Sequence, residues 1–293
     1  DGERAVAQAA ARFGIWFGIS SLATHSIEEI AALTDGPKLF QLYVHKDQGL
    51  NASMIERCQA SGFDALALTV DTIVSGKRER CLRSGFTTPP RFSASSLWSY
   101  ATRPRWTLDY VFGPKFRLPN LDGHVQEGSG KSVSIQDYFN TMLDTNMDWD
   151  TAARIRQDWG GTFALKGVMS AADARRAVEI GADAIWISNH GGRQLDGSRA
   201  PFDQLREIVD AVGGEIEIVL DGGVRRGTHA LKGLAAGATA ASGGRLYLYA
   251  LAAAGQEGVE RAIEILKEEI ERGMRLMGVT SIDQLTADRL RWR

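Results

Sequence analysis

The sequence has few of the features that mark secreted, membrane-spanning or nucleic-acid-binding proteins. Only two cysteines occur in 293 residues, Cys58 and Cys81, and their spacing fits neither a metal site nor a redox pair. No apolar run approaches the ~18 residues that a membrane span needs. The formal net charge of −2 leaves no basic surplus for nucleic acid. Residues 1–13 show no signal-peptide pattern. These absences predict a metal-free, cytoplasmic globular protein with free thiols.

Strand and helix patterns alternate along most of the chain. Strands are predicted at 15–20, 39–44, 65–70, 163–168, 184–188, 216–220 and 239–242. Helices are predicted at 4–13, 51–61, 149–158, 171–180, 201–212, 227–236, 246–277 and 281–290, and a capping box starts another at Ser26. Such alternation favours an α/β fold, a (β/α)8 TIM barrel in one domain over 1–293. Because a barrel of this kind needs eight strands, we expect its first strand to be missing from this sequence.

The segment 73–147 differs in composition from the rest of the chain and is expected to be an insert. Five of the seven prolines lie between Pro89 and Pro119, among many aromatic residues. The stretch 91–119 has five basic residues and one acidic residue. One interpretation is a self-packed lid with solvated cations. The other is a loop that contacts an anionic membrane, at the inner face of the plasma membrane.

The stretch 184–196 joins an apolar strand to a polar, glycine-rich loop. The loop contains His190 and Arg193, three residues apart. In βα-repeat proteins, the loops at the carboxyl ends of the strands carry the chemistry. Taken alone, however, the pattern is equally typical of an ordinary turn with two surface side chains.

Two glycine-rich loops follow the last two predicted strands, at 221–227 and 242–245. Each precedes a predicted helix, so backbone N–H groups and a helix N-terminus are available to an anion. Arg225 and Arg245 add positive charge. In barrels, the last two such loops frequently hold a phosphate, and the pair therefore predicts a phosphate site.

Further polar residues lie at or just beyond the ends of other predicted strands. They are Gln41, Tyr43, Thr69, Asp71, Arg78 and Lys166. Each taken singly could be structural. Together they predict a cluster of polar groups at one rim of the barrel, because the carboxyl ends of parallel strands lie on the same side.

Several motifs resemble those of the FMN-dependent L-2-hydroxy acid dehydrogenase/oxidase family. They are Ser-Asn-His-Gly-Gly-Arg-Gln-Leu-Asp (188–196), Leu-Thr-Val-Asp (68–71), Phe-Gln-Leu-Tyr (40–43), Leu-Lys-Gly (165–167) and Asp-Gly-Gly-Val-Arg-Arg-Gly (221–227). They occur in the family's order over nearly the whole chain. The segment 249–259 is most similar to bacterial L-lactate dehydrogenases, and 105–109 is similar to the membrane-associated loop of those enzymes and of mandelate dehydrogenases.

The resemblance implies bound FMN and oxidation of an L-2-hydroxy acid, with L-lactate favoured, to the 2-oxo acid. It further implies electron transfer to a quinone or cytochrome and a homotetramer. By position, His190 is the catalytic base with Asp71 beside it, and Tyr43, Arg78 and Arg193 bind the substrate. The implied cofactor-binding residues are Ser20, Gln41, Thr69, Lys166, Ser188, Asp221, Gly222, Gly223, Arg225, Gly244 and Arg245. Leu22 stands where glycolate oxidases carry tryptophan, which favours lactate or an aryl hydroxy acid.

Three alternatives remain open at this point. The first is an oxidase that acts on lactate, glycolate or mandelate and reduces oxygen to hydrogen peroxide. The second is a phosphate-binding barrel with non-redox chemistry, such as a flavin-dependent isomerase. The third is an inactive fragment that only binds a partner.

Overall fold

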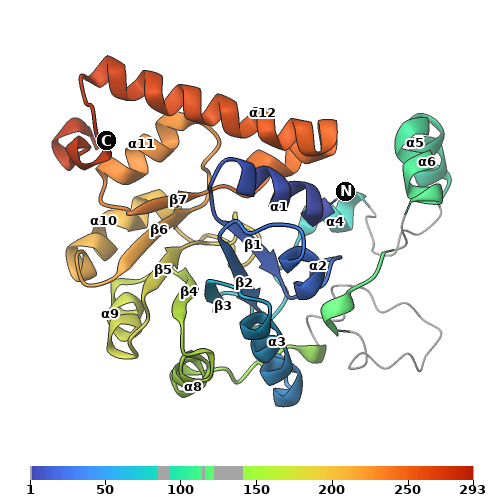
Figure 1. The fold of residues 1–293 in the computed structure, drawn as a ribbon, viewed down its shortest axis with the longest axis horizontal. Coiled ribbons are helices and arrows are strands. Elements are labelled where there is room, and N and C mark those ends of the chain that lie inside the picture. Colours follow the sequence, from blue (N-terminus) through green and yellow to red (C-terminus); the bar gives the residue numbers. More distant parts are fainter. Residues whose placement is uncertain (1, 85–92, 114–115, 122–140, 293) are drawn as a thin grey trace.

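Seven parallel strands form one curled sheet, in which neighbours along the chain are also neighbours in space (Figure 1). The computed structural model describes residues 2–84, 93–113, 116–121 and 141–292. The strands are β1 (Phe17–Ser20), β2 (Lys38–Leu42), β3 (Ala65–Thr69), β4 (Thr162–Val168), β5 (Ala184–Ile187), β6 (Glu217–Asp221) and β7 (Ala240–Ser242). The predicted α/β fold of the barrel type is confirmed, with every strand where the sequence places it to within a few residues. A strand ahead of Asp1 stays a prediction.

Helices surround the sheet and connect its strands (Figure 1). They are α1 (Gly2–Arg12), α2 (Ile27–Ala31), α3 (Gln48–Ala60), α4 (Glu79–Ser84), α5 (Ala94–Ala101), α6 (Pro104–Phe112), α8 (Trp149–Trp159), α9 (Ala171–Glu179), α10 (Pro201–Val212), α11 (Gly227–Ala235) and α12 (Arg245–Met277). Short 3-10 turns are η1 (Pro119–Leu121), η2 (Ile282–Gln284) and η3 (Ala287–Arg289). Local signals start several helices as predicted: Ser26 and Glu29 form the capping box of α2, and Ser170 caps α9.

The last part of the chain differs from the prediction. The helix expected at 281–290 is wrong, because η2 and η3 occupy this range with Leu285 between them in an extended conformation. Leu285 is buried with Leu231, Ala235 and Val279. The free energy gained by burying the Leu285 side chain outweighs the local preference for a continuous helix. Helix α12 is also interrupted, because Gly255 adopts a positive φ of 60° that breaks the helical backbone.

The two faces of the sheet differ in side-chain size. Outward-facing residues such as Phe40, Leu68 and Phe163 belong to the main core between the strands and the helices. The inner face carries mostly small residues, and Ala67 and Ala164 form a separate cluster there. Since side chains alternate along a strand, the polar residues that end the strands share this inner face. They are Ser20, Gln41, Thr69, Lys166, Ser188 and Asp221.

The first and last long helices lie side by side in the fold. Figure 1 shows α1 next to α12, and the two are joined by an ion pair of 2.5 Å between Arg12 Nη1 and Glu260 Oε2. The buried side of α1 is a row of small residues, with Ala7 and Ala9 fully enclosed. Small side chains allow close approach of the helices that they separate.

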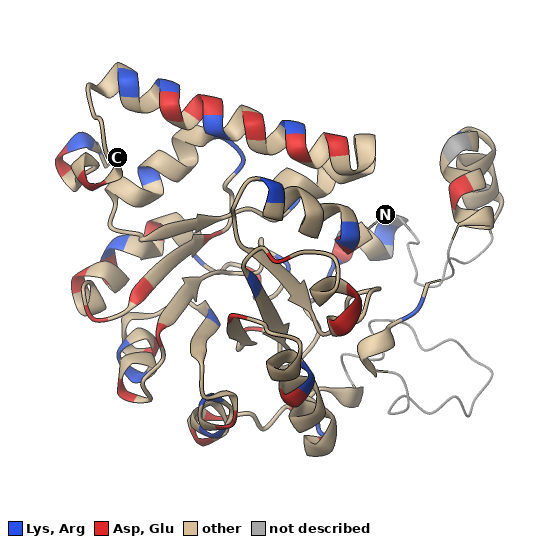
Figure 2. Ribbon diagram, in the orientation of Figure 1, with Lys and Arg blue, Asp and Glu red and all other residues tan. Residues whose placement is uncertain are grey.

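Charged residues gather on the outside of the molecule, and α12 shows them most clearly, with acidic and basic residues along its length (Figure 2). No helix in the described part of the chain is both long and apolar enough to cross a bilayer. Helices α5 and α6 form a pair set apart from the sheet (Figure 1). Their exposed side chains include Trp98 (73 % exposed) and Phe112 (82 % exposed).

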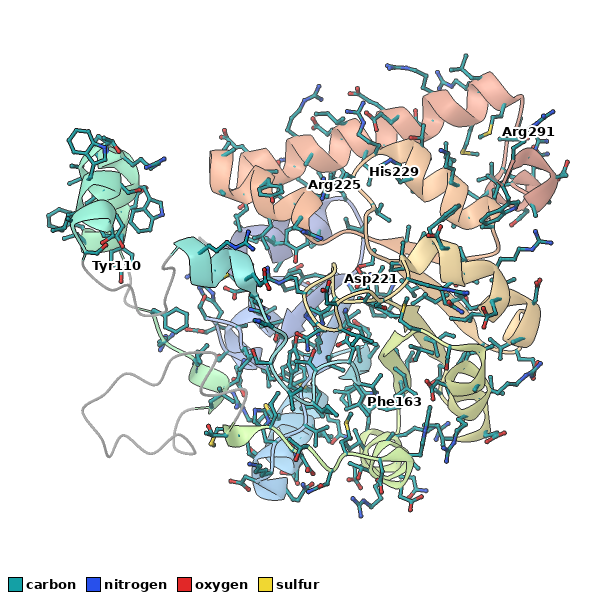
Figure 3. The ribbon with its side chains drawn as sticks, turned by 180° about the vertical axis from the view of Figure 1, so that it is seen from behind. Tyr110, Phe163, Asp221, Arg225, His229 and Arg291 are labelled. Atoms are coloured by element: carbon teal, nitrogen blue, oxygen red, sulfur yellow. The ribbon has the colours of Figure 1, made fainter. Side chains whose placement is uncertain are left out.

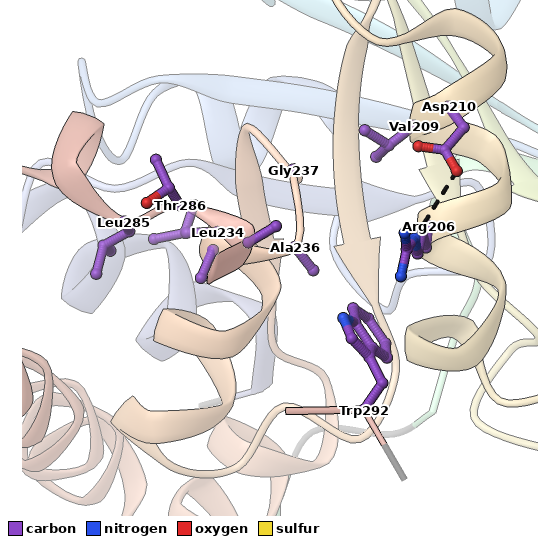
Figure 4. A pocket seen from close by; sticks show the side chains of 11 residues that line it. Arg206, Val209, Asp210, Leu234, Ala236, Gly237, Leu285, Thr286 and Trp292 are labelled. Atoms are coloured by element: carbon purple, nitrogen blue, oxygen red, sulfur yellow. Dashed lines mark ion pairs between the residues drawn. The ribbon is translucent and has the colours of Figure 1, made fainter. Parts of the chain in front are cut away.

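A cavity of about 470 Å³ lies between α10, α11 and the C-terminal turns (Figure 4). Arg206 pairs with Asp210 on its wall, and Trp292 stacks on Phe202 at 5.3 Å between ring centroids. The cavity is lined by the last turns of α10 and α11, which precede β6 and β7. It therefore lies at the end of the sheet opposite to the polar cluster.

Candidate active site

A buried ion pair forms the floor of the polar cluster. Lys166 Nζ lies 2.9 Å from Asp221 Oδ2 and donates a hydrogen bond of 3.2 Å to Ser188 Oγ. The Ser188 hydroxyl in turn donates to the same Asp221 oxygen at 2.8 Å. The ammonium also lies 5.6 Å from the ring centroid of Trp186, its neighbour in register on β5. Because the lysine side chain is only 9 % exposed, these partners are what makes its charge tolerable.

Residues of β2 and β3 continue the cluster beside this pair. Gln41 Nε2 donates to Thr69 Oγ1 at 2.9 Å and to Tyr43 Oη at 3.2 Å. Burial, and next the charge of Asp71, raise the pKa of Tyr43 far above its ordinary value. The phenol therefore keeps its proton at all ordinary pH values and can donate a hydrogen bond. Ser20 ends β1 beside Gln41 in register, and its Oγ accepts from Leu22 N–H at 3.1 Å.

His190 and Asp71 form a pair at the rim. His190 Nδ1 lies 3.0 and 3.2 Å from the two carboxylate oxygens of Asp71. Thr72 Oγ1 also donates to Asp71 Oδ1, at 2.9 Å. The carboxylate occupies Nδ1, which leaves His190 Nε2 on the side of Tyr43, whose Oη is 3.4 Å away. Such a histidine carries the lone pair of a base on Nε2.

The backbone around His190 is strained and tethered. Among the described residues, His190 alone outside glycine has a positive φ, of 56°. A conformation of this kind persists where the surroundings hold it in place. The His190 N–H donates to Ser188 Oγ at 3.1 Å, and the Arg245 guanidinium donates to Gly191 O at 2.8 Å. Asn189 Oδ1 accepts from Gly192 N–H at 3.1 Å. The loop is thus held from both sides.

Two arginines, Arg78 and Arg193, act on each other through their charges. The Nε atom of Arg78 is buried and has no hydrogen-bond partner in the part of the chain that the structure describes. Burial, followed by the charge of Arg193, lowers the pKa of Arg78 from its ordinary value. The positive charge of Arg193 therefore acts unfavourably on the charged form of Arg78. An anion between them would relieve the repulsion and satisfy the orphaned donor.

The two glycine-rich loops lie beyond β6 and β7. In Figure 3, Asp221 lies near the middle of the molecule, and Arg225 and His229 lie near α11 and α12. A Cβ added at Gly223 or Gly244 would meet no atom within 4 Å, so both positions border open space. Gly244 is the N-cap of α12 and offers no side-chain cap, which leaves the first N–H groups of the helix available to an anion.

The structure brings together most of the residues that the sequence predicts for the site. His190, Asp71, Tyr43 and the buried group around Lys166 form one connected set. Gly222, Gly223, Gly244 and Arg245 lie in the adjoining loops, and the Arg225 side chain in the first of these loops is exposed. Among the described residues, no three His, Cys, Asp or Glu side chains are placed to hold a metal ion.

Sequence reasoning missed three side chains that contact this set: Thr72, Trp186 and Gln194. Thr72 follows Asp71 directly, and Gln194 lies within the 188–196 motif, so proximity to a predicted residue could have indicated both. For Trp186, the sequence predicts only a place in the apolar strand 184–188. Its inward direction follows from the alternation that also places Ser188 on the inner face.

Comparisons with known proteins find similar proteins over nearly the whole chain. The model of the FMN-dependent dehydrogenase family matches residues 1–292. The chain is 39 % identical over 292 residues to an L-lactate dehydrogenase of Pectobacterium atrosepticum, covering 99 % of this chain and 75 % of the relative. It is 40 % identical over 296 residues to that of Alcaligenes faecalis, covering 99 % and 76 %.

Solved structures of similar proteins also match nearly the whole chain. The crystal structure of the monotopic membrane protein (S)-mandelate dehydrogenase is 35 % identical, with a TM-score of 0.90 over 99 % of this chain and 76 % of that one. A lactate oxidase of Pediococcus acidilactici is 32 % identical, with a TM-score of 0.78 over 97 % and 69 %.

Proposed function

The chain belongs to the FMN-dependent dehydrogenase family, and we propose that it oxidises an L-2-hydroxy acid, L-lactate first, to the 2-oxo acid and passes the electrons to a quinone or cytochrome. Similarity to L-lactate and (S)-mandelate dehydrogenases supports this substrate class. One observation carries the proposal. The His190–Asp71 pair lies against Tyr43, and the charges of Arg78 and Arg193 both act on the same phenol, so together these groups suit an alcohol next to a carboxylate.

The residues present fit FMN as the resident cofactor. The loops at Gly222, Gly223, Gly244 and Arg245, with Arg225, would hold its phosphate, because Gly223 and Gly244 border open space and the loops offer backbone donors and positive charge. The inner-face residues Ser20, Gln41, Thr69, Lys166, Ser188 and Asp221 would contact the rest of the cofactor. Bound FMN supplies a two-electron acceptor for the hydrogen on the substrate carbon.

Arg78 and Arg193 bind the substrate carboxylate in this proposal. A guanidinium donates two parallel hydrogen bonds to a carboxylate, and the buried Nε of Arg78 already has an unused donor. Since the two arginines repel each other without an anion, substrate binding removes an unfavourable interaction as well as forming new bonds. The carboxylate is thereby fixed beside Tyr43.

His190 Nε2 takes the proton that oxidation of the alcohol releases. Asp71 holds the proton on His190 Nδ1, which keeps Nε2 free as the base, and then stabilises the imidazolium that forms. Tyr43 keeps its own proton and orients the substrate hydroxyl through a hydrogen bond. These roles for His190, Asp71 and Tyr43 are part of the proposal.

The test is a visible absorption spectrum of the flavin-loaded protein under anaerobic conditions. We expect L-lactate to bleach the oxidised flavin band, with L-mandelate as the comparison substrate. An oxidised band that persists with both acids would refute the proposal, and it would favour a flavin-dependent isomerase. A colourless protein that still associates with a partner would favour the inactive fragment.

An oxidase is the second candidate, because the chain is also similar to a lactate oxidase. Both candidates use the same substrate-binding residues and differ only in the electron acceptor. Hydrogen peroxide formed in air at one equivalent per substrate would identify the oxidase. A much lower peroxide yield, together with rapid reduction of a quinone analogue, would identify the dehydrogenase.

We further propose that the stretch 91–119 contacts the membrane surface. Helices α5 and α6 lie apart from the sheet (Figure 1), and their Trp98, Trp106 and Phe112 side chains are exposed. Aromatic side chains near basic residues suit the boundary between lipid headgroups and acyl chains. A relative with 35 % identity is a monotopic membrane protein. The protein would thus lie at the inner face of the plasma membrane, and a homotetramer stays part of the proposal.

A further inference from the structure

We propose that Gln194 is the positioning residue that holds the segment 71–78 against the loop 188–193, so that the histidine–aspartate pair and the arginine pair form together. This inference rests on the proposed function for the roles of those pairs. The hydrogen bonds that carry it do not depend on that function.

The Gln194 side chain bonds only to backbone atoms of the facing segment. Its Nε2 donates to Asp71 O at 3.0 Å and to Val74 O at 3.1 Å. Its Oε1 accepts from Gly76 N–H at 3.4 Å. The amide thus uses both of its donors and its acceptor, and the opposite orientation would place Oε1 against two carbonyl oxygens. We call these three hydrogen bonds the Gln194 bridge.

The two backbones also touch directly beside the bridge. A Cβ added at Gly76 would lie 2.2 Å from Arg193 O and 2.8 Å from the Cα of Gln194. A Cβ added at Gly167 would lie 2.6 Å from the Cβ of Asp71. At Gly76 and Gly167 the chain segments are therefore too close for a side chain to fit between them. A shift of one backbone is transmitted to the other.

The bridge connects both halves of the site because of where its ends lie. Asp71, at one end of the facing segment, bonds to His190, while Arg78 lies at the other end, where the charge of Arg193 acts on it. On the opposite side, Gln194 directly follows Arg193 in the chain. Three short connections thus fix four functional side chains relative to each other.

Charge makes such a fixed connection necessary. The charge of Arg193 lowers the pKa of Arg78, so the two like charges disfavour each other when no anion is bound. The neutral Gln194 bridge opposes this repulsion through hydrogen bonds to backbone atoms, and it adds no charge that would compete for the substrate carboxylate. The site can therefore keep two arginines together before the substrate arrives.

The test compares Gln194→Leu with a matched control, Gln59→Leu. Gln59 also bridges two segments through its amide, because its Nε2 donates to Asp158 O at 3.0 Å and to Trp159 O at 2.9 Å. That bridge joins α3 to α8 and touches none of the proposed site residues. Gln194→Glu is a second variant of nearly the same size, which keeps the acceptor for Gly76 N–H and loses both donors.

Two measurements on the flavin-loaded protein decide the proposal. Hydrogen–deuterium exchange should become about tenfold faster or more in peptides covering 71–79 of Gln194→Leu, and stay unchanged there in Gln59→Leu. Calorimetric titration with oxalate, an unreactive dicarboxylate, should show an affinity lowered about ten- to hundredfold by Gln194→Leu. Gln194→Glu should change both quantities in the same direction. FMN affinity should stay within about twofold in all three variants.

The proposal is wrong if exchange in 71–79 is the same in Gln194→Leu and the wild type. It is also wrong if FMN affinity falls as much as oxalate affinity, because a general loosening of the fold would then explain both. A wild-type protein that binds no oxalate and shows no flavin reduction would refute the proposed function instead. In that case the exchange comparison, which needs no substrate, still decides whether the bridge holds the segment.

Discussion

The buried ion pair between Lys166 and Asp221 offers a test of the site that needs no substrate. We expect Lys166→Met to destabilise the fold, because it leaves the Asp221 carboxylate without its cation in a poorly hydrated place. The two side chains are 9 % and 16 % exposed, so water can replace the lost partner only in part. Breaking such a pair from one side costs about 3–5 kcal/mol.

The structure favours the lower end of that range. Asp221 keeps the hydrogen bond of 2.8 Å from Ser188 Oγ when the lysine is gone. Methionine also fills most of the volume of the lysine chain against Trp186. We therefore expect a loss of about 3 kcal/mol in the free energy of unfolding, which is roughly a hundredfold change in the folding equilibrium.

Urea unfolding followed by circular dichroism measures this loss. The matched control is Lys38→Met, since Lys38 is also buried but donates to the carbonyls of Thr34 and Gly36 instead of a carboxylate. Adding Asp221→Asn to Lys166→Met should restore part of the stability, because the unpaired charge is then removed. FMN affinity should fall for Lys166→Met and stay unchanged for Lys38→Met. A Lys166→Met variant within about 0.5 kcal/mol of the wild type, or a double variant no more stable than the single one, would refute this reasoning.

Three further predictions concern other parts of the molecule. His190→Gln should retain bound FMN but lower the rate of flavin reduction by L-lactate about 10²- to 10⁴-fold in anaerobic stopped flow, and an unchanged rate would remove His190 as the base. A hydrogen bond from Arg57 lowers the pKa of Glu28 to about 2, so the folded state gains stability from this carboxylate above its unfolded pKa of 4.5 and loses it as pH falls through 2. Glu28→Gln should therefore lower the melting temperature at pH 7 but not at pH 2, and an equal difference at both pH values in calorimetry would contradict the assignment. Replacing Trp98 and Phe112 together by serine should reduce co-sedimentation with anionic lipid vesicles while flavin reduction stays normal, whereas unchanged co-sedimentation would favour a lid.

The sequence predicts the strands of the sheet well, because the pattern that marks a strand lies within a few neighbouring residues. Each strand is an apolar run between turn signals, and alternation alone assigns Gln41, Thr69 and Lys166 to the inner face. The rim position of His190 follows from the rule that the carboxyl ends of parallel strands lie together.

Features that depend on partners distant in the chain could not be predicted in this way. Gln194 lies 123 residues from Asp71, and only the folded chain shows that the two are joined. The expected helix at 281–290 failed for the same reason, because the burial of Leu285 against α11 overrides the local preference. The strained backbone of His190 likewise depends on tethers from Ser188 and Arg245.

The pairing of α1 with α12 ties the beginning of the chain to the proposed phosphate site. Helix α12 begins at Arg245 after its N-cap Gly244, and the first N–H groups of the helix would hold the phosphate in this proposal. Beyond the break at Gly255, the same helix pairs with α1 through Glu260. Clipping residues 2–14 by a protease would therefore release α12 and loosen its amino end. The amount of FMN that stays bound would then indicate whether α1 is still packed on α12. Cleavage near residue 14 would thus cause loss of FMN, although the cleaved bond lies some 230 residues before Gly244.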